Sequence, residues 1–147
     1  MKRNRISETE RRIRRFVIDT NVFVAAINPF LNPIQRPHKD TKTLKLLIKL
    51  IVNEELELIG NSRLVDEYKR LAEELNSETS RLILRELMGK VKIVNVLEEA
   101  LMRCKPYLPA KESADVMHAA TSLQTDAILI TNDTDFDRIR QLRIIQV

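Results

Sequence analysis

Residues 15–21 read Arg-Phe-Val-Ile-Asp-Thr-Asn, and this stretch decides the class of fold. Its apolar run is followed at once by Asp19, a pattern typical of a buried strand in a parallel sheet. Residues 127–133, Ala-Ile-Leu-Ile-Thr-Asn-Asp, repeat the pattern and end at Asp133. In α/β proteins, ligands bind outside the carboxyl ends of parallel strands. The two stretches therefore predict an α/β domain with an acidic site at one edge of its sheet.

The rest of the chain alternates between strand and helix patterns. Apolar runs predict strands at 15–18, 56–59, 91–94, 127–130 and 143–147. Helical spacing predicts a short helix after Asp19 and further helices at 41–53, 62–75, 78–88, 97–102, 112–124 and 133–140. Ser62 is expected to cap one of them and Gly89 to end another. Residues 28–37 contain three prolines and are expected to form a loop. The alternation predicts parallel pairing with helices on both faces of the sheet.

Length and composition favour one folded domain without a membrane segment. The chain has 147 residues, and no apolar run approaches the roughly 20 residues that cross a bilayer. Cys104 is the single cysteine, which excludes an internal disulfide and a cysteine zinc site. The two histidines, His38 and His118, are far apart in the sequence, so an imidazole-rich metal site is not expected. We expect a cytoplasmic protein.

Positive charge is concentrated at the N-terminus. Residues 1–15 hold seven basic and two acidic residues, whereas the whole chain has a net charge of +4. We therefore divide the chain into a basic arm, residues 1–15, and a folded domain, residues 16–147. One interpretation of the arm is a solvated tail. The other is an arm that approaches RNA phosphates through Arg11, Arg12, Arg14 and Arg15.

Four acidic positions carry the functional prediction. Asp19 and Asp133 follow predicted strands, while Glu67 and Asp115 lie in predicted helices. Carboxylates that meet in one place repel each other and stay ionised only if cations neutralise them. Hard divalent metals bind oxygen ligands, and such sites commonly act on phosphate esters. The positions predict a metal-dependent nuclease.

Each acidic residue also has an ordinary structural interpretation. Asp19 and Asp133 can cap helices, and Glu67 can be a residue on the flank of a helix. Asp115 lies near a helix start, where the dipole favours a negative charge, and Glu112 shares its flank. His118 falls on the opposite side of that helix and is expected at the surface rather than as a ligand.

Taken in order, the motifs resemble the PIN domain (PilT N-terminus) family. They are Asp-Thr-Asn at 19–21, Glu-Tyr at 67–68, Asp115 followed by His-Ala-Ala at 118–120, and Thr-Asn-Asp-Thr-Asp-Phe at 131–136. Each motif alone is weak, but the four together, with the expected element under each, are fairly specific. The resemblance covers about residues 16 to 147; the basic segment lies outside it.

The resemblance implies a three-layer α/β/α sandwich around a central, mainly parallel sheet of about five strands. It also implies a ribonuclease that uses Mg²⁺ or Mn²⁺, as in the toxins of prokaryotic toxin–antitoxin pairs. The partners implied are RNA, a small antitoxin and a second copy in a homodimer. On this view the catalytic, metal-binding carboxylates are Asp19, Glu67, Asp115 and Asp133, supported by Asn21, Glu112, Thr131 and Asp135.

Two other classes of function compete with the nuclease. The first is a non-catalytic RNA-binding or scaffold module on the same fold, which would be free to lose its carboxylates. The second is a phosphoacceptor or phosphatase domain. Haloacid-dehalogenase-type enzymes need a second aspartate two residues after the first, where this chain has Asn21. Receiver domains need an acidic pair at the first strand, and Thr20 follows Asp19.

Overall fold

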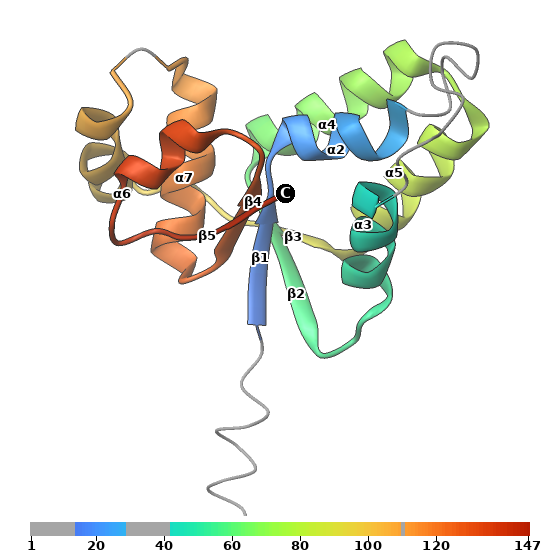
Figure 1. Cartoon of the computed structure of the whole chain (residues 1–147), viewed down its shortest axis with the longest axis horizontal. Helices are drawn as coiled ribbons and strands as arrows, with labels where there is room; N and C mark the ends of the chain where they lie inside the picture. The colour runs from blue at the N-terminus through green and yellow to red at the C-terminus, as the bar shows by residue number, and fades with distance from the viewer. Residues whose placement is uncertain (1–13, 29–41, 110) are drawn as a thin grey trace, which may run out of the picture.

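One parallel sheet of five strands forms the centre of the computed structural model, which describes residues 14–28, 42–109 and 111–147 (Figure 1). The strands lie in the order β3-β2-β1-β4-β5, and each neighbouring pair is parallel. They are β1 (Arg14–Ile18), β2 (Leu56–Gly60), β3 (Val91–Ile93), β4 (Ile128–Thr131) and β5 (Arg143–Gln146). The predicted α/β class and the parallel sheet are confirmed.

Helices cover both faces of the sheet, as predicted. The chain passes from β1 outward to β3 through α2 (Thr20–Ile27), α3 (Lys42–Val52), α4 (Ser62–Leu75) and α5 (Glu78–Lys90). It returns to β4 through α6 (Glu98–Cys104), η2 (Lys105–Tyr107) and α7 (Ser113–Thr125), and η3 (Thr134–Arg138) precedes β5. Crossovers between parallel strands are right-handed, so outward and return steps place their helices on opposite faces. Figure 1 shows α6 and α7 on one side of the sheet and α2 to α5 on the other.

The strand order reverses between β1 and β4, and this switch point positions the site. The chain leaves β1 toward β2 on one side, while β4 pairs with β1 on the other. Ile18 is in register with Ile130, and the backbone N–H of Asp19 donates to the Ile130 carbonyl at 2.9 Å. The residues that follow β1 and β4 therefore share one sheet edge, where α/β folds bind ligands.

Three local predictions were wrong. Asn61, not Ser62, caps α4, because its side chain accepts a hydrogen bond from the backbone N–H of Leu64 at 2.8 Å. Gly89 does not end α5, which continues to Lys90 and runs directly into β3. The predicted last helix is a shorter 3-10 helix, Thr134–Arg138, whose cap residue is Asp133.

Some predictions lie on residues outside the described ranges. The loop at 28–37 falls there apart from Asn28, the C-cap of α2, and so do residues 1–13 of the basic arm. Among the helices that are described, none combines the length and the apolar character needed to cross a membrane.

Candidate metal centre

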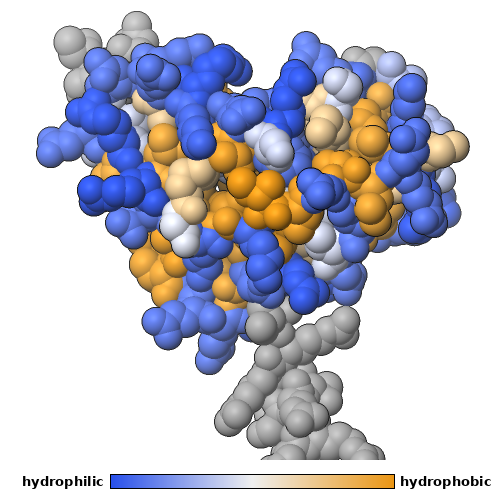
Figure 2. Space-filling model, turned by 180° about the vertical axis from the view of Figure 1, so that it is seen from behind, coloured by the Kyte–Doolittle hydropathy of each residue, from blue (hydrophilic) through white to orange (hydrophobic). Residues whose placement is uncertain are grey.

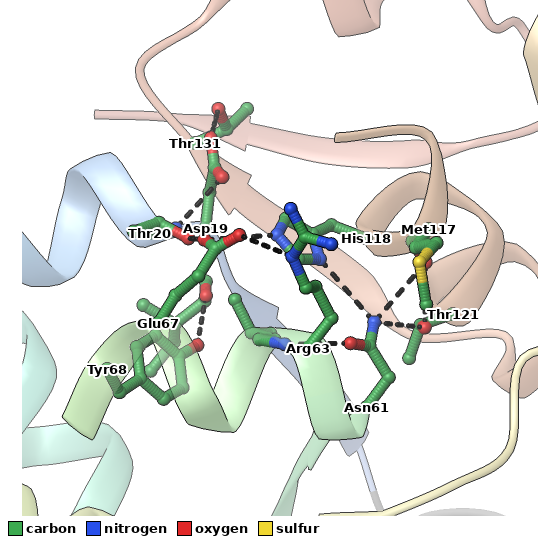
Figure 3. A network of polar contacts seen from close by, with 12 residues as sticks. Asp19, Thr20, Asn61, Arg63, Glu67, Tyr68, Met117, His118, Thr121 and Thr131 are labelled. Atoms are coloured by element: carbon green, nitrogen blue, oxygen red, sulfur yellow. Dashed lines mark hydrogen bonds and ion pairs between the residues drawn. The ribbon is translucent and has the colours of Figure 1, made fainter. Parts of the chain in front are cut away.

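Asp19 is the buried centre of the site. Its side chain is 2 % exposed and caps α2, with Oδ1 accepting from the Thr20 backbone N–H at 2.9 Å. Oδ2 accepts from the hydroxyl of Thr131 at 2.7 Å, so the residue after β1 and the last residue of β4 fix the carboxylate together (Figure 3). Burial raises the pKa of Asp19, and the hydrogen bond from Thr131 only partly offsets this. A cation at this position would favour the ionised form.

Glu67 approaches Asp19 from α4. The hydroxyl of Thr20, next to Asp19 in the chain, donates to Glu67 Oε2. The following residue, Tyr68, is buried and donates its hydroxyl to the carbonyl of Ile18, which holds α4 against the end of β1. Contact with His118 is the main reason that the pKa of Glu67 is lowered; the Thr20 hydrogen bond and Arg63 lower it further, while burial opposes them. Glu67 is therefore ionised at neutral pH.

Asp115 and His118 complete the cluster from α7. One ligand atom from each of Asp19, Asp115 and His118 lies within 4.8 Å of the others. His118 is 0 % exposed, so its predicted surface position was wrong. Helix α7 contacts β1, β2, β4, α4 and α6, which leaves it no solvent-facing side at this position. The missed signal is the absence of any charged residue from 116 to 125, typical of a helix that is buried all round.

Asn61 fixes the ring of His118. Because Asn61 Oδ1 accepts from Leu64, its Nδ2 must be the group that faces the other partners. Nδ2 donates to the Thr121 hydroxyl at 2.9 Å and lies 3.4 Å from His118 Nδ1. An N–H group facing Nδ1 favours Nδ1 as an acceptor, and we therefore expect the neutral ring to carry its proton on Nε2. Nε2 lies 3.5 Å from Glu67 Oε2, so the proton is directed at the carboxylates (Figure 3).

We expect Asn61→Ala to destabilise the protein by about 2 kcal/mol, because it removes a helix cap and leaves buried polar groups without partners. Ser62→Ala is the matched control: Ser62 is exposed on the first turn of the same helix and should change stability by less than about 0.5 kcal/mol. Urea unfolding of both variants measures the difference. Equal stabilities of the two variants would contradict the role assigned to Asn61.

Asp133 is not part of this cluster and pairs with a lysine. The ammonium of Lys111 contacts Asp133 Oδ2, and it lies 3.2 Å from Asp135 Oδ2. Partial burial tends to raise the pKa of Asp133, but the hydrogen bonds from Lys111 and the Asp135 backbone outweigh it and the pKa is lowered. Asp133 still neighbours Asp19, since the Thr131 hydroxyl that donates to Asp19 also accepts from the Asp133 N–H at 3.0 Å.

The other predicted site residues lie in different places. Thr131 is buried beside Asp19, and Asp135 meets Asp133 through Lys111. Asn21 is exposed on the first turn of α2, and Glu112 is exposed at the N-cap of α7 without a side-chain capping bond. Arg14 and Arg15 lie at the start of β1, the opposite end of that strand from Asp19, and Arg15 pairs with Glu57 at 3.5 Å. Arg11 and Arg12 are outside the described residues.

The carboxylates suit a hard divalent cation. Asp19, Asp115 and Glu67 offer only oxygen, the donor that Mg²⁺ and Mn²⁺ prefer. Burial and the neighbouring Asp19 charge raise the pKa of Asp115 by more than His118 and Lys111 lower it, so the positive charge near this carboxylate does not balance its surroundings. Among the described residues, Nε2 of His118 is the one buried side-chain polar atom without a hydrogen-bond partner. The oxygen donors and the raised pKa values of Asp19 and Asp115 fit a site shaped for a bound cation; an Nε2 that carries the ring proton can donate a hydrogen bond there but cannot be a metal ligand.

The chain belongs to the PIN domain family, whose model matches residues 16–142. Members of this family are generally nucleases. No curated protein gives a significant match to the sequence.

Three solved structures share the fold at low sequence identity. VapBC2 from Rickettsia felis, bound to a DNA fragment from their promoter, has a TM-score of 0.63 and 18% identity, covering 90% of this chain and 98% of that chain. FitAcB from Neisseria gonorrhoeae has a TM-score of 0.57 and 19% identity, covering 88% of this chain and 96% of that chain. VapBC-1 from nontypeable Haemophilus influenzae has a TM-score of 0.56 and 16% identity, covering 90% of this chain and 97% of that chain.

We expect Asp115→Asn to stabilise the metal-free protein. The raised pKa of Asp115 means that its charge costs stability; this cost is absent below the ordinary pKa and complete above the raised one. The gain should therefore be present at pH 7 and shrink as the pH falls toward 4. About 1 kcal/mol would raise the Tm by about 2–4 °C. Thermal melts of both proteins in EDTA at pH 7 and pH 4 measure the change in Tm. A lower Tm of Asp115→Asn at pH 7 would contradict a destabilising charge at Asp115.

Proposed function

We propose that the protein is a metal-dependent ribonuclease, the toxin of a toxin–antitoxin pair. The observation that carries the proposal is the cluster of Asp19, Asp115 and His118 within 4.8 Å at the switch edge of a PIN fold, with Glu67 3.5 Å from His118. The pKa values of Asp19, which is buried, and Asp115, which is half-buried, are both raised, so keeping both charged is costly unless a cation binds.

Asp19, Asp115 and Glu67 would hold Mg²⁺ or Mn²⁺, which supplies positive charge toward a scissile phosphate and lowers the pKa of water. Thr131 and Thr20 keep two of these carboxylates oriented, because each donates a hydroxyl hydrogen to one of them. His118, fixed by Asn61, directs its Nε2 proton at Glu67. A carboxylate not fully engaged by the cation can accept a proton from the attacking water. Positive charge near the RNA would come from Lys111 and Arg63 at the site.

The function is tested by incubating the protein with single-stranded RNA, structured RNA and DNA of the same sequence, in Mg²⁺, Mn²⁺ or EDTA. We expect cleavage of RNA that needs a divalent ion and stops in EDTA. Absence of cleavage on every RNA, together with RNA binding that EDTA does not change, would overturn the nuclease and favour the non-catalytic RNA-binding module.

An antitoxin and a homodimer partner both need exposed apolar surface. Figure 2 shows hydrophobic side chains gathered across the middle of one face of the molecule. The exposed large hydrophobic side chains of the described chain include Ile93, Leu97 and Met102, which are between 54% and 67% exposed; the figure does not assign them to this face. Exposed hydrophobic patches mark protein–protein contacts, so this surface supports a protein partner. Expression of the chain with and without the product of an adjacent small gene, followed by growth and light-scattering measurements, tests both partners: the antitoxin should restore growth, and the isolated chain should have the mass of a dimer.

A further inference from the structure

Lys111 provides a cation inside the site. It lies between η2 and α7, and its backbone N–H donates to the carbonyl of Leu108 at 3.2 Å. Its side chain is only 25% exposed, although lysine ammonium groups normally extend into water. The ammonium instead meets two carboxylates, Asp133 and Asp135. Lys111 therefore neutralises one half of the acidic edge from within the chain.

The direction of the side chain is fixed by its surroundings. Lys111 lines a hollow together with apolar residues of α6, of the segment after η2 and of α7, among them Leu101, Leu108 and Val116. The hydrocarbon stem of a lysine packs favourably along such a wall, while the ammonium extends beyond it. In this arrangement the ammonium emerges at Asp133. Both side chains of this pair are at most a quarter exposed, unlike those of an ion pair between two surface residues.

The acidic residues at this edge of the sheet therefore form two groups. Among the described residues, the group able to hold a metal ion consists of Asp19, Asp115 and His118, with Glu67 beside it. Asp133 and Asp135 form the second group, and their charge is already met by Lys111. A divalent ion at the second group would have to displace the ammonium from both carboxylates.

We propose that Lys111 takes the place of a second divalent cation, so that this chain binds one metal ion and the Lys111 ammonium supplies the positive charge beside it. This inference rests on the proposed function, because it assigns a role within the same site. The lysine then stands next to the phosphate that the carboxylate site would receive, as a fixed point charge. Removal of its charge should free Asp133 and Asp135 to bind a second ion.

The number of Mn²⁺ ions bound per chain, measured by calorimetry and by electron paramagnetic resonance without RNA, tests the proposal. We expect one ion in the wild type and two in Lys111→Met, which keeps the stem and removes the charge. Lys111→Gln should also bind two, and the double variant Lys111→Met with Asp133→Asn should return to one. Lys105→Met is the matched control, since Lys105 lines the same hollow, and it should stay at one.

The number of bound ions is compared for variants whose circular dichroism spectrum and melting temperature match those of the wild type. Two ions in the wild type, or one ion in both Lys111 variants, would overturn the role of Lys111 while leaving the nuclease untouched. No bound ion in the wild type would overturn the metal-dependent function and this inference together. An increase from one to two bound Mn²⁺ ions on removal of the Lys111 charge, reversed by Asp133→Asn, would support the role of Lys111.

Discussion

Asp19→Asn is expected to lower the rate of RNA cleavage by at least about two orders of magnitude while the protein stays folded. Loss of a residue that only supports a metal ligand already costs 10–100-fold, so loss of the central carboxylate should cost at least as much. Asparagine has the same size and keeps an oxygen that can accept from the Thr20 N–H. It removes the negative charge that Asp19 brings to the cluster with Asp115 and His118.

The experiment compares cleavage rates, Mn²⁺ affinity and Tm of the two proteins. Asp66→Asn is the matched control, because Asp66 is exposed on α4 next to Glu67 in the sequence. It should retain the rate and the affinity of the wild type. If Asp19→Asn cleaves within a factor of three of wild type, Asp19 is not part of the site; if it unfolds, Asp115→Asn provides the same comparison.

The fold could be predicted from sequence because its signals are local. The apolar run of residues 16–18 and its partner at 127–130 have the length and composition of buried parallel strands, and the structure pairs them directly. The residue that caps α4 was less clear from the sequence. Asn61 and Ser62 are both good cap residues, and only the tertiary contacts of Asn61 with Thr121 and His118 decide between them.

The position of the candidate site could be predicted where carboxylates follow strands, but not where its parts are brought together by packing. The positions of Asp19 and Asp133 after apolar runs indicate these residues in the sequence, since a charge at the end of a buried strand needs a partner. His118 was misplaced because a helical wheel assumes one apolar stripe, while α7 is enclosed on every side at that residue. Lys111 carries no sequence signal: a lysine before a helix is ordinary, and its contact with Asp133, 22 residues away, exists only in the folded chain.

His118→Leu is expected to reduce cleavage by roughly 10–100-fold, the cost typical of removing a group that orients a metal ligand. Leucine fills the buried volume but places no N–H beside Glu67, so the pKa of that carboxyl loses the largest of the contributions that lower it. His118→Gln is the matched variant: its amide can place an N–H near the position of Nε2 and should keep most of the activity. Cleavage rates and Mn²⁺ affinities of the three proteins measure the effect.

A second readout separates a positioning role from a purely structural one. With Nδ1 facing the amide of Asn61 at 3.4 Å, the neutral ring should carry its proton on Nε2, and ¹⁵N NMR of the two ring nitrogens reports this directly. The chain has two histidines, so His38→Asn assigns the signals. Asn61→Ala should then weaken the preference for this tautomer. A ring protonated on Nδ1 in the wild type would leave Nε2 free to bind the metal itself, and His118 would then be a ligand instead of the residue that orients Glu67.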